Sequence, residues 1–496
     1  MKNNKALEEL KKIDNEIILL SQISGVLVWD QEEVPSKGVE RRGEQLALLS
    51  SKVHDLVASE KVVDLVAQLE DQDLEDPDKA LVRIYKKSSE RSRKLDRDFV
   101  HHFSKLTTKS QSVWALARKE DDWPSFEPYL TELISLVKEK AEAYGYEDDP
   151  YDALLENFEA NTKTKEVSKL FDKLKRDLQP LIENQQRFEE VDDTFLYAKY
   201  PIDKQKYFIN EVLSSIGFEW ERGVLGDSVH PYTISLGDDD IRITTRYTES
   251  SVASPLFSAL HEGGHALYEM GCANAVTKGT ALANGASLGF HESQSRLWEN
   301  MIGRSKEFWS HFYPTFSNLF PLQTENIDLD HFVKAINKVK PSYIRVDADE
   351  LTYNLHIILR FELERELLSG SLSVKDLPLA WNDKMKELLG VEVPNNKVGV
   401  LQDVHWSMGE LGYFPTYTLG NLYAAQIFET MNKEFDVAKE VAKGNFSPIK
   451  GWLNENILQY GSIYEPKDII NKVCGSGLST THLSSYLVNK YRQGDK

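Results

Sequence analysis

Apolar residues recur every three or four positions along most of the chain, which is the period of an amphipathic α-helix. Three representative stripes are Leu7, Leu10, Ile13, Ile17 and Leu20; Val167, Leu170, Phe171, Leu174 and Leu178; and Leu351, Leu355, Ile358 and Leu359. The polar breaks between stripes, such as 147–150, are short and indicate turns inside a domain rather than linkers. The pattern predicts a mainly α fold and one domain over residues 1–496.

Residues 232–248 depart from the helical pattern. Ile234 and Leu236 alternate with polar residues, a glycine-containing turn follows, and Ile241 and Ile243 then alternate with polar residues again. Alternation with a period of two, interrupted by a turn, is typical of a β-hairpin. We therefore expect one small sheet in an otherwise helical protein.

Composition removes several classes of protein from consideration. The net charge of −20 argues against a nucleic-acid partner and against an anionic membrane surface, because both favour a basic face. The chain has no apolar run of about 18 residues, and its first residues lack the apolar core of a signal peptide. Cys272 and Cys474 are too few for a disulfide framework or a thiolate metal site. These features predict a cytoplasmic protein.

The strongest chemical signal is HEGGH at 261–265, within an apolar helical stretch. Residues four apart lie on one face of a helix, so His261 and His265 can both reach one cation. Glu262 points slightly aside, where it can take a proton from a water molecule at the metal. This arrangement is the structural basis of the H-E-x-x-H motif of zinc peptidases. A surface helix without a metal is the alternative, but buried histidines left unpaired would be costly.

A catalytic zinc needs a third protein ligand and an open position. The pattern with a third histidine six residues further on fails, because position 271 is glycine. Glu292 is the best candidate, since residues 271–289 are rich in small and turn-forming residues and can join two packed helices. We expect Glu292 on the second helix, facing His261 and His265 on the first.

Two adjacent glycines inside the predicted helix need an explanation, because each costs roughly 1 kcal/mol relative to alanine. We expect Gly263 and Gly264 to leave room for a substrate backbone to approach. The reaction that follows from this site is amide hydrolysis, with Glu262 taking a proton from water and later giving it to the leaving amine. From the residues alone, the chain is a mainly helical zinc peptidase.

Several segments together resemble the carboxypeptidase Taq family of thermostable zinc metallocarboxypeptidases. The similar segments are DIRIT (240–244), HEGGH (261–265), HESQ (291–294), IRVDAD (344–349) and GVLQDVHW (399–406), with LVWDQEEVPSKGVERRGEQLALL (27–49) and YDALLENFE (151–159). They occur in the family's order and span nearly the whole chain. The five short motifs in order are far more specific than the metal motif alone.

The resemblance implies a neurolysin-like fold, in which a two-lobed helical body is split by a deep substrate groove with the metal at its floor. It implies an enzyme that releases amino acids one at a time from the free C-termini of peptides, with broad preference. It also implies Zn²⁺, for which Co²⁺ can substitute, and a homodimer.

The resemblance also assigns roles to individual residues. His261, His265 and Glu292 match the metal ligands, and Glu262 matches the general base. Arg345 matches a substrate-binding position, where its guanidinium can grip a C-terminal carboxylate through two parallel hydrogen bonds. The alternative for Arg345 is an internal salt bridge to one of the aspartates at 347 and 349.

Further candidates surround the substrate. His405 can donate to the developing oxyanion or can be a packed structural histidine, with residues 402 and 403 positioning it. Tyr417 is the preferred tyrosine of the three at 413, 417 and 423 for assisting the oxyanion. His230 can line the groove, Arg242 is expected to pair structurally with Asp240 or a neighbour, and His291 is expected to lie outside the metal's direct ligands.

Two other functions compete with this interpretation. An oligopeptidase that cuts internal bonds could use the same metal site, and an amidated C-terminus distinguishes the two activities. A peptide-binding protein with a structural metal is the other alternative. Structural zinc normally has four protein ligands, and the sequence offers three.

Overall fold

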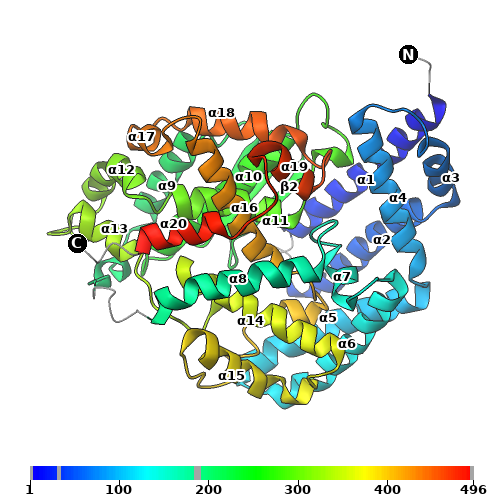
Figure 1. The fold of residues 1–496 in the computed structure, drawn as a ribbon, viewed down its shortest axis with the longest axis horizontal. Helices are drawn as coiled ribbons and strands as arrows, with labels where there is room; N and C mark the ends of the chain where they lie inside the picture. The colour runs from blue at the N-terminus through cyan, green and yellow to red at the C-terminus, as the bar shows by residue number, and fades with distance from the viewer. Residues whose placement is uncertain (1–3, 31–34, 184–190, 492–496) are drawn as a thin grey trace. The chain divides into compact units, whose positions relative to one another are not determined.

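The computed structural model describes residues 4–30, 35–183 and 191–491 (Figure 1). Within these ranges the chain forms twenty α-helices and one three-stranded sheet, so the predicted mainly α fold with a small sheet is confirmed. Residues 31–34, part of the N-terminal stretch that carries the resemblance, lie outside the described residues.

The described chain divides into two compact units, called here the first and the second unit. The first contains residues 1–93, 192–336 and 427–477, and the second contains residues 94–191, 337–426 and 478–496. The prediction of one domain over the whole chain stays a prediction.

The helices of the first unit are α1 (Lys5–Trp29), α2 (Val39–Val57), α3 (Glu60–Leu69), α4 (Asp76–Lys94), α9 (Ile202–Ile216), α10 (Ala253–Cys272), α11 (Leu288–Arg296), α12 (Lys306–Leu319), α13 (Leu329–Ile336), α17 (Val437–Ala442), α18 (Ser447–Asn456) and α19 (Pro466–Cys474). Those of the second unit are α5 (Arg97–Glu120), α6 (Trp123–Tyr144), α7 (Pro150–Leu155), α8 (Thr164–Glu183), α14 (Glu350–Ser369), α15 (Leu377–Leu389) and α20 (Thr481–Tyr491). Helix α16 (Pro415–Asn432) begins in the second unit and ends in the first.

The predicted apolar stripes form the buried faces of helices. Leu10, Ile13 and Ile17 of α1 are buried, as are most residues of the stripe on α8. Helix α8 continues through Pro180. Every residue of the stripe at 351–359 is buried, because α14 is enclosed on nearly all sides by the rest of the second unit.

The expected hairpin is present and belongs to a larger sheet. Strands β2 (Thr233–Gly237) and β3 (Asp240–Thr245) pair antiparallel, and β1 (Gly223–Asp227) pairs with the other edge of β3 in parallel. The central strand buries Ile241 and Ile243. Arg242 binds Asp240 through two hydrogen bonds of 2.8 Å, as predicted. Helix α10 packs against β3, which places the sheet beside the HEGGH helix.

Helix α10 is buried on almost every side, in keeping with its high apolar content. It packs between α9 and α11 of the same unit (Figure 1). A Cβ on Gly263 would lie 2.7 Å from Leu213 of α9, and a Cβ on Gly264 would lie 2.7 Å from the backbone of α11 at Gln294 and Ser295. The prediction that these glycines leave room for a substrate is therefore wrong: they let α10 approach its neighbouring helices.

We expect Gly264→Ala to destabilise the protein by about 1–3 kcal/mol, because the new methyl group meets backbone that cannot move aside. Gly451→Ala is the matched control, since a Cβ there meets nothing within 4 Å and Gly451 also lies inside a helix, α18. Alanine at 451 should stabilise the protein by up to about 1 kcal/mol. Urea unfolding measures both changes, and equal effects of the two substitutions would contradict the assigned role of Gly264.

Candidate metal centre

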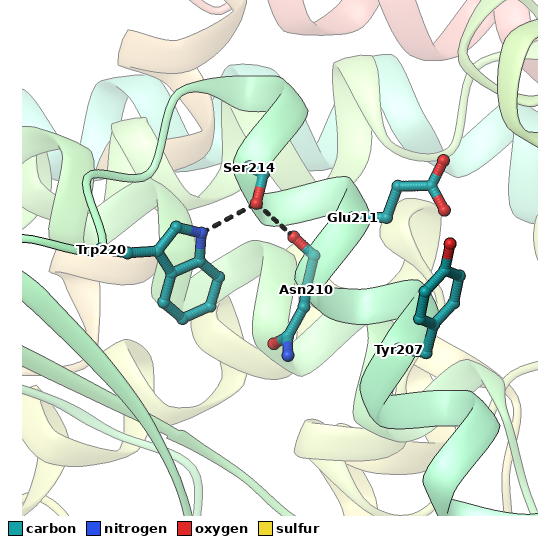
Figure 2. Close-up of a pocket in the computed structure, with 5 residues that line it drawn as sticks. All are labelled: Tyr207, Asn210, Glu211, Ser214 and Trp220. Carbon is teal, nitrogen blue, oxygen red and sulfur yellow. Dashed lines mark hydrogen bonds between the residues drawn. The ribbon is translucent and has the colours of Figure 1, made fainter.

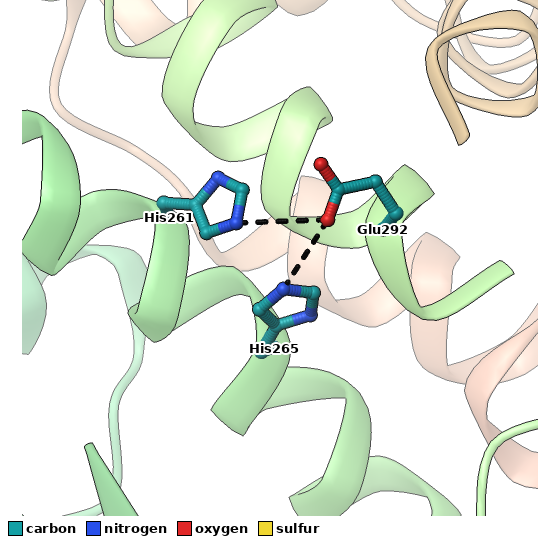
Figure 3. A group of neighbouring side chains, drawn as sticks. All are labelled: His261, His265 and Glu292. Carbon is teal, nitrogen blue, oxygen red and sulfur yellow. Dashed lines mark ion pairs between the residues drawn. The ribbon is translucent and has the colours of Figure 1, made fainter. Parts of the chain in front are cut away.

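Helices α10 and α11 bring together the three side chains predicted to hold a metal. Figure 3 shows the Glu292 carboxylate of α11 pointing towards the rings of His261 and His265 on α10. Glu292 Oε2 lies 3.6 Å from His261 Nε2 and 3.5 Å from His265 Nε2. All three ligand atoms lie within 4.8 Å of one another. They form the one group of its kind found among the described residues.

Two of the three distances between the donor atoms match those expected around a tetrahedral zinc ion. Zinc binds imidazole nitrogen and carboxylate oxygen at about 2.0–2.2 Å, so its ligand atoms lie about 3.3–3.6 Å apart. The two distances from Glu292 Oε2 to the histidine nitrogens are 3.5 and 3.6 Å. Three protein ligands would leave a four-coordinate zinc ion one further position, as in catalytic zinc sites.

The outer nitrogen of each histidine has a partner of its own. His261 Nδ1 lies 2.9 Å from Glu299 Oε2, and His265 Nδ1 lies 2.5 Å from His291 Nδ1. These contacts turn Nε2 of both rings towards Glu292. Ligand histidines commonly hold their second nitrogen in this way.

Arg296 connects the two carboxylates on the α11 side of the site. Its Nε donates to Glu292 Oε1 at 2.6 Å, and its Nη1 lies 3.5 Å from Glu299 Oε2. Arg304 also donates to Glu299. Glu299 lies in a π-helical segment, Leu297–Ile302, that directly continues α11. Such π-helical turns frequently mark functional sites.

The buried charged groups strongly shift one another's pKa values. Burial raises the pKa of Glu292, but Arg296 and the two histidines outweigh burial and hold it well below its ordinary value. The pKa of Glu299 is lowered to about 2 despite burial, and the hydrogen bond to His261 is the largest of the contributions that lower it. Burial and the neighbouring His291 lower the pKa of His265 to about 3, so this ring is neutral at pH 7. Both carboxylates are ionised at the same pH.

Glu262 lies beside this group and is also buried. Thr233 of β2 donates to Glu262 Oε2 at 2.6 Å, and this hydrogen bond connects the sheet to α10. Burial raises the pKa of Glu262, and the nearby His261 opposes this shift. A raised pKa favours proton exchange by a carboxyl group, because the protonated form becomes easier to reach.

A second group of predicted residues lies in the second unit. The Arg345 guanidinium is 4.8 Å from the centre of the Tyr417 ring, and Tyr417 Oη is 3.3 Å from His405 Nε2. Burial lowers the pKa of His405 to about 4, so this imidazole is neutral at pH 7. The structure therefore gathers Arg345, His405 and Tyr417 within one unit, whereas the metal group belongs to the other.

Arg345 does form an internal salt bridge, but not with an aspartate of its own motif. Its Nε and Nη2 each lie 3.0 Å from Asp403 Oδ1, and its Nη1 donates to Tyr353. Asp403 Oδ2 meanwhile accepts from the fully buried Arg360. The suggested pairing with residue 347 or 349 is wrong, and Asp403 holds two arginines rather than simply positioning His405.

The remaining predicted residue, His230, lies in the loop between β1 and β2. Its side chain is exposed, and its backbone carbonyl accepts a hydrogen bond from Ser228. The structure places it in the same unit as the metal group, and its role in substrate binding stays a prediction.

Sequence reasoning missed the outer partners of the metal group. Arg296 and Glu299 follow Glu292 by four and seven positions. This spacing places them on the same face of a helix as Glu292 and could have indicated their role. His291 is not one of the three converging side chains, and its contact with His265 could not be predicted from the sequence. Tyr353, which accepts from Arg345, and Arg360, which binds Asp403, were also missed, because no sequence pattern relates them to those residues.

A separate hollow lies on the outer face of α9 (Figure 2). It is lined by Tyr207, Asn210, Glu211, Ser214 and Trp220, and Trp220 Nε1 donates to Ser214 Oγ at 2.8 Å. The opposite face of α9 supports α10 through Leu213. The hollow is thus distinct from the metal group.

Comparison with known proteins agrees with this geometry. Residues 9–491 match the model of the family described as carboxypeptidase Taq (M32) metallopeptidase. Carboxypeptidase 1 of Bacillus subtilis is 39% identical over 478 residues, covering 95% of each chain, and thermostable carboxypeptidase 1 of Thermus thermophilus is 39% identical over 505 residues, covering 98% of each. The crystal structure of the M32 carboxypeptidase from Deinococcus radiodurans matches with a TM-score of 0.96 and 34% identity, covering 99% of each chain.

A helical fold with a His–His–Glu group defines this protein as a metallopeptidase of the H-E-x-x-H type. The chain belongs to the carboxypeptidase Taq (M32) family, and it is a metallocarboxypeptidase, an enzyme that hydrolyses peptides from their C-terminus. The resemblance noted in the sequence is confirmed. Among the described residues, no helix combines the length and apolarity needed to cross a membrane.

Proposed function

We propose that the protein is a zinc carboxypeptidase of broad specificity that releases single amino acids, with Glu262 as general base. The observation that carries this proposal is the convergence of three ligand atoms beside a buried carboxyl group. His261, His265 and Glu292 would hold the ion, for which Co²⁺ can substitute. When bound, zinc supplies Lewis-acid chemistry, polarising the scissile carbonyl and lowering the pKa of water towards 7.

Glu262 would handle the protons of the reaction. With Oε2 held by Thr233, its carboxylate is oriented by the sheet rather than left to rotate. It would accept a proton from the attacking water and return it to the amine that leaves. The raised pKa of Glu262 supports both steps, because the group must change protonation state twice in each turnover.

Arg345 would recognise the free C-terminus of the substrate. Its Nε donates to Asp403 and its Nη1 to Tyr353, and Nη2 lies 3.0 Å from Asp403 Oδ1. A guanidinium has five N–H groups in a planar fork, which suits a further, bidentate bond to a carboxylate. His405, neutral at pH 7, and Tyr417 would donate to the oxyanion. His230 would line the path of the peptide.

The resemblance to the family and the net charge of the chain support proposals about cellular location, oligomeric state and partners. We propose a cytoplasmic homodimer, each chain one domain, that acts on peptides with a free C-terminus. No nucleic acid and no membrane is expected as a partner, in keeping with the net charge of −20.

A blocked dipeptide tests the activity directly. We expect the free terminal amino acid to appear, to stop appearing after chelation, and to return when zinc is added back. The same peptide with an amidated C-terminus should resist cleavage, because it offers Arg345 no carboxylate. Rapid cleavage of the amidated peptide would instead favour an oligopeptidase that cuts internal bonds.

A further inference from the structure

The two histidines of the metal group are held by different chemistry. His261 contacts the carboxylate of Glu299, whereas His265 contacts another imidazole, that of His291. His291 in turn lies 2.6 Å from Glu269 Oε1 through its Nε2. Three side chains therefore form a chain from His265 through His291 to Glu269, and all are largely buried, with side-chain exposures between 14% and 17%.

Hydrogen-bonding rules allow one arrangement of protons along this chain when His265 binds a metal. Nε2 of His265 must offer its lone pair, so the proton of the neutral ring sits on Nδ1. That proton can only be donated to Nδ1 of His291, which must therefore be an acceptor. The proton of His291 then sits on Nε2 and is donated to Glu269.

We propose that the His291–Glu269 pair is a positioning device that fixes the tautomer and ring orientation of His265. The inference rests on the proposed metal site and adds two residues to it. Glu269 selects the tautomer of His291, and His291 selects the tautomer of His265. Neither residue is one of the three converging side chains.

The placement of the two residues supports this role over simple packing. His291 precedes Glu292 on α11, so one helix delivers both the third ligand and the group that orients the second. Glu269 follows His265 by one helical turn on α10, on the same face. The rings of His265 and His291 are 4.5 Å apart between centres, and Tyr268 covers His291 from the side. A change in the spacing of α10 and α11 would move ligand and orienting group together.

Zinc affinity, measured by competition with a chromogenic chelator, tests the inference without reference to turnover. We expect His291→Phe, which keeps the ring but removes the acceptor, to weaken zinc binding by about 10–100-fold. His291→Asn places an amide oxygen near the position of Nδ1 and should restore most of the affinity. Tyr268→Phe is the matched control, because it keeps the ring beside His291 and removes a hydroxyl that accepts from the backbone N–H of Ala286, outside the chain from His265 to Glu269. It should bind zinc like the wild type.

Glu269→Ala provides a second route if His291→Phe does not fold, and it should also weaken zinc binding. Wild-type affinity in both His291→Phe and Glu269→Ala would overturn the inference. Equal losses in His291→Phe and His291→Asn would overturn it too, since the acceptor would then be irrelevant. If the wild-type chain bound no zinc at all, the proposed function itself would fail, an outcome distinct from failure of the inference alone.

Discussion

Replacing Glu262 by glutamine is expected to reduce the turnover of a C-terminal peptide bond by about 10²–10⁴-fold while zinc still binds. The amide has nearly the shape of the carboxylate and can still accept from Thr233, but it cannot take a proton from water. Glu262 is not one of the three converging ligand atoms, so the metal group should survive. Steady-state kinetics on a blocked dipeptide, combined with zinc titration, measures the two properties separately.

Glu211→Gln is the matched control for this substitution. Glu211 lies on α9 in the same unit and lines the hollow of Figure 2. Its replacement by glutamine is the same chemical change, made away from the metal group. It should leave turnover unchanged. A Glu262→Gln enzyme that retained wild-type turnover would show that the base has been assigned to the wrong residue.

Replacing Asp403 by asparagine is expected to lower the free energy of unfolding by about 3–5 kcal/mol. Asp403 is the shared counter-charge of Arg345 and Arg360, whose side chains are 7% and 0% exposed. Asparagine would leave two buried cations close together without a compensating charge. The Asp403 carboxylate is held ionised by the two arginines, which lower its pKa far enough to outweigh burial.

Asp240→Asn makes the same change in an exposed ion pair. The side chains of Asp240 and Arg242 are 42% and 28% exposed, so solvent screens their attraction. The expected cost there is about 0.2–1 kcal/mol. Urea unfolding compares the two variants, and similar small losses in both would mean that the Asp403 cluster is not held together by charge.

The hydrophobic pattern was sufficient to predict the class of the fold. Stripes on α1, α8 and α14 became buried faces, and the alternation at 232–248 became β2 and β3. Strand β1 was missed because its parallel partner, β3, is separated from it by β2 in the sequence. Local periodicity reports local structure, and a parallel pairing depends on tertiary packing.

The convergence of His261, His265 and Glu292 was predictable because its constraints are nearly local. Two histidines one turn apart share a helix face, and a loop of small residues returns the chain with Glu292. Gly264 was misread because its contact is with the backbone of α11, and no residue pattern encodes how closely two helices approach. For the same reason the contact between His265 and His291 could not be found before the two helices were placed together.

The partner of Arg345 was also beyond local reasoning. Aspartates at 347 and 349 are neighbours in sequence, yet the arginine reaches across to residue 403. Asp349 instead caps α14 by accepting from Thr352. A charged residue close in sequence is often used by the backbone, so ion-pair partners follow from the fold rather than from proximity along the chain.

X-ray data collected from zinc-soaked crystals on both sides of the zinc absorption edge test whether His261, His265 and Glu292 bind zinc. We expect one anomalous peak per chain, about 2.0–2.2 Å from His261 Nε2, His265 Nε2 and a carboxylate oxygen of Glu292. A peak bound elsewhere, or clear density for these three side chains with no peak between them, would contradict it.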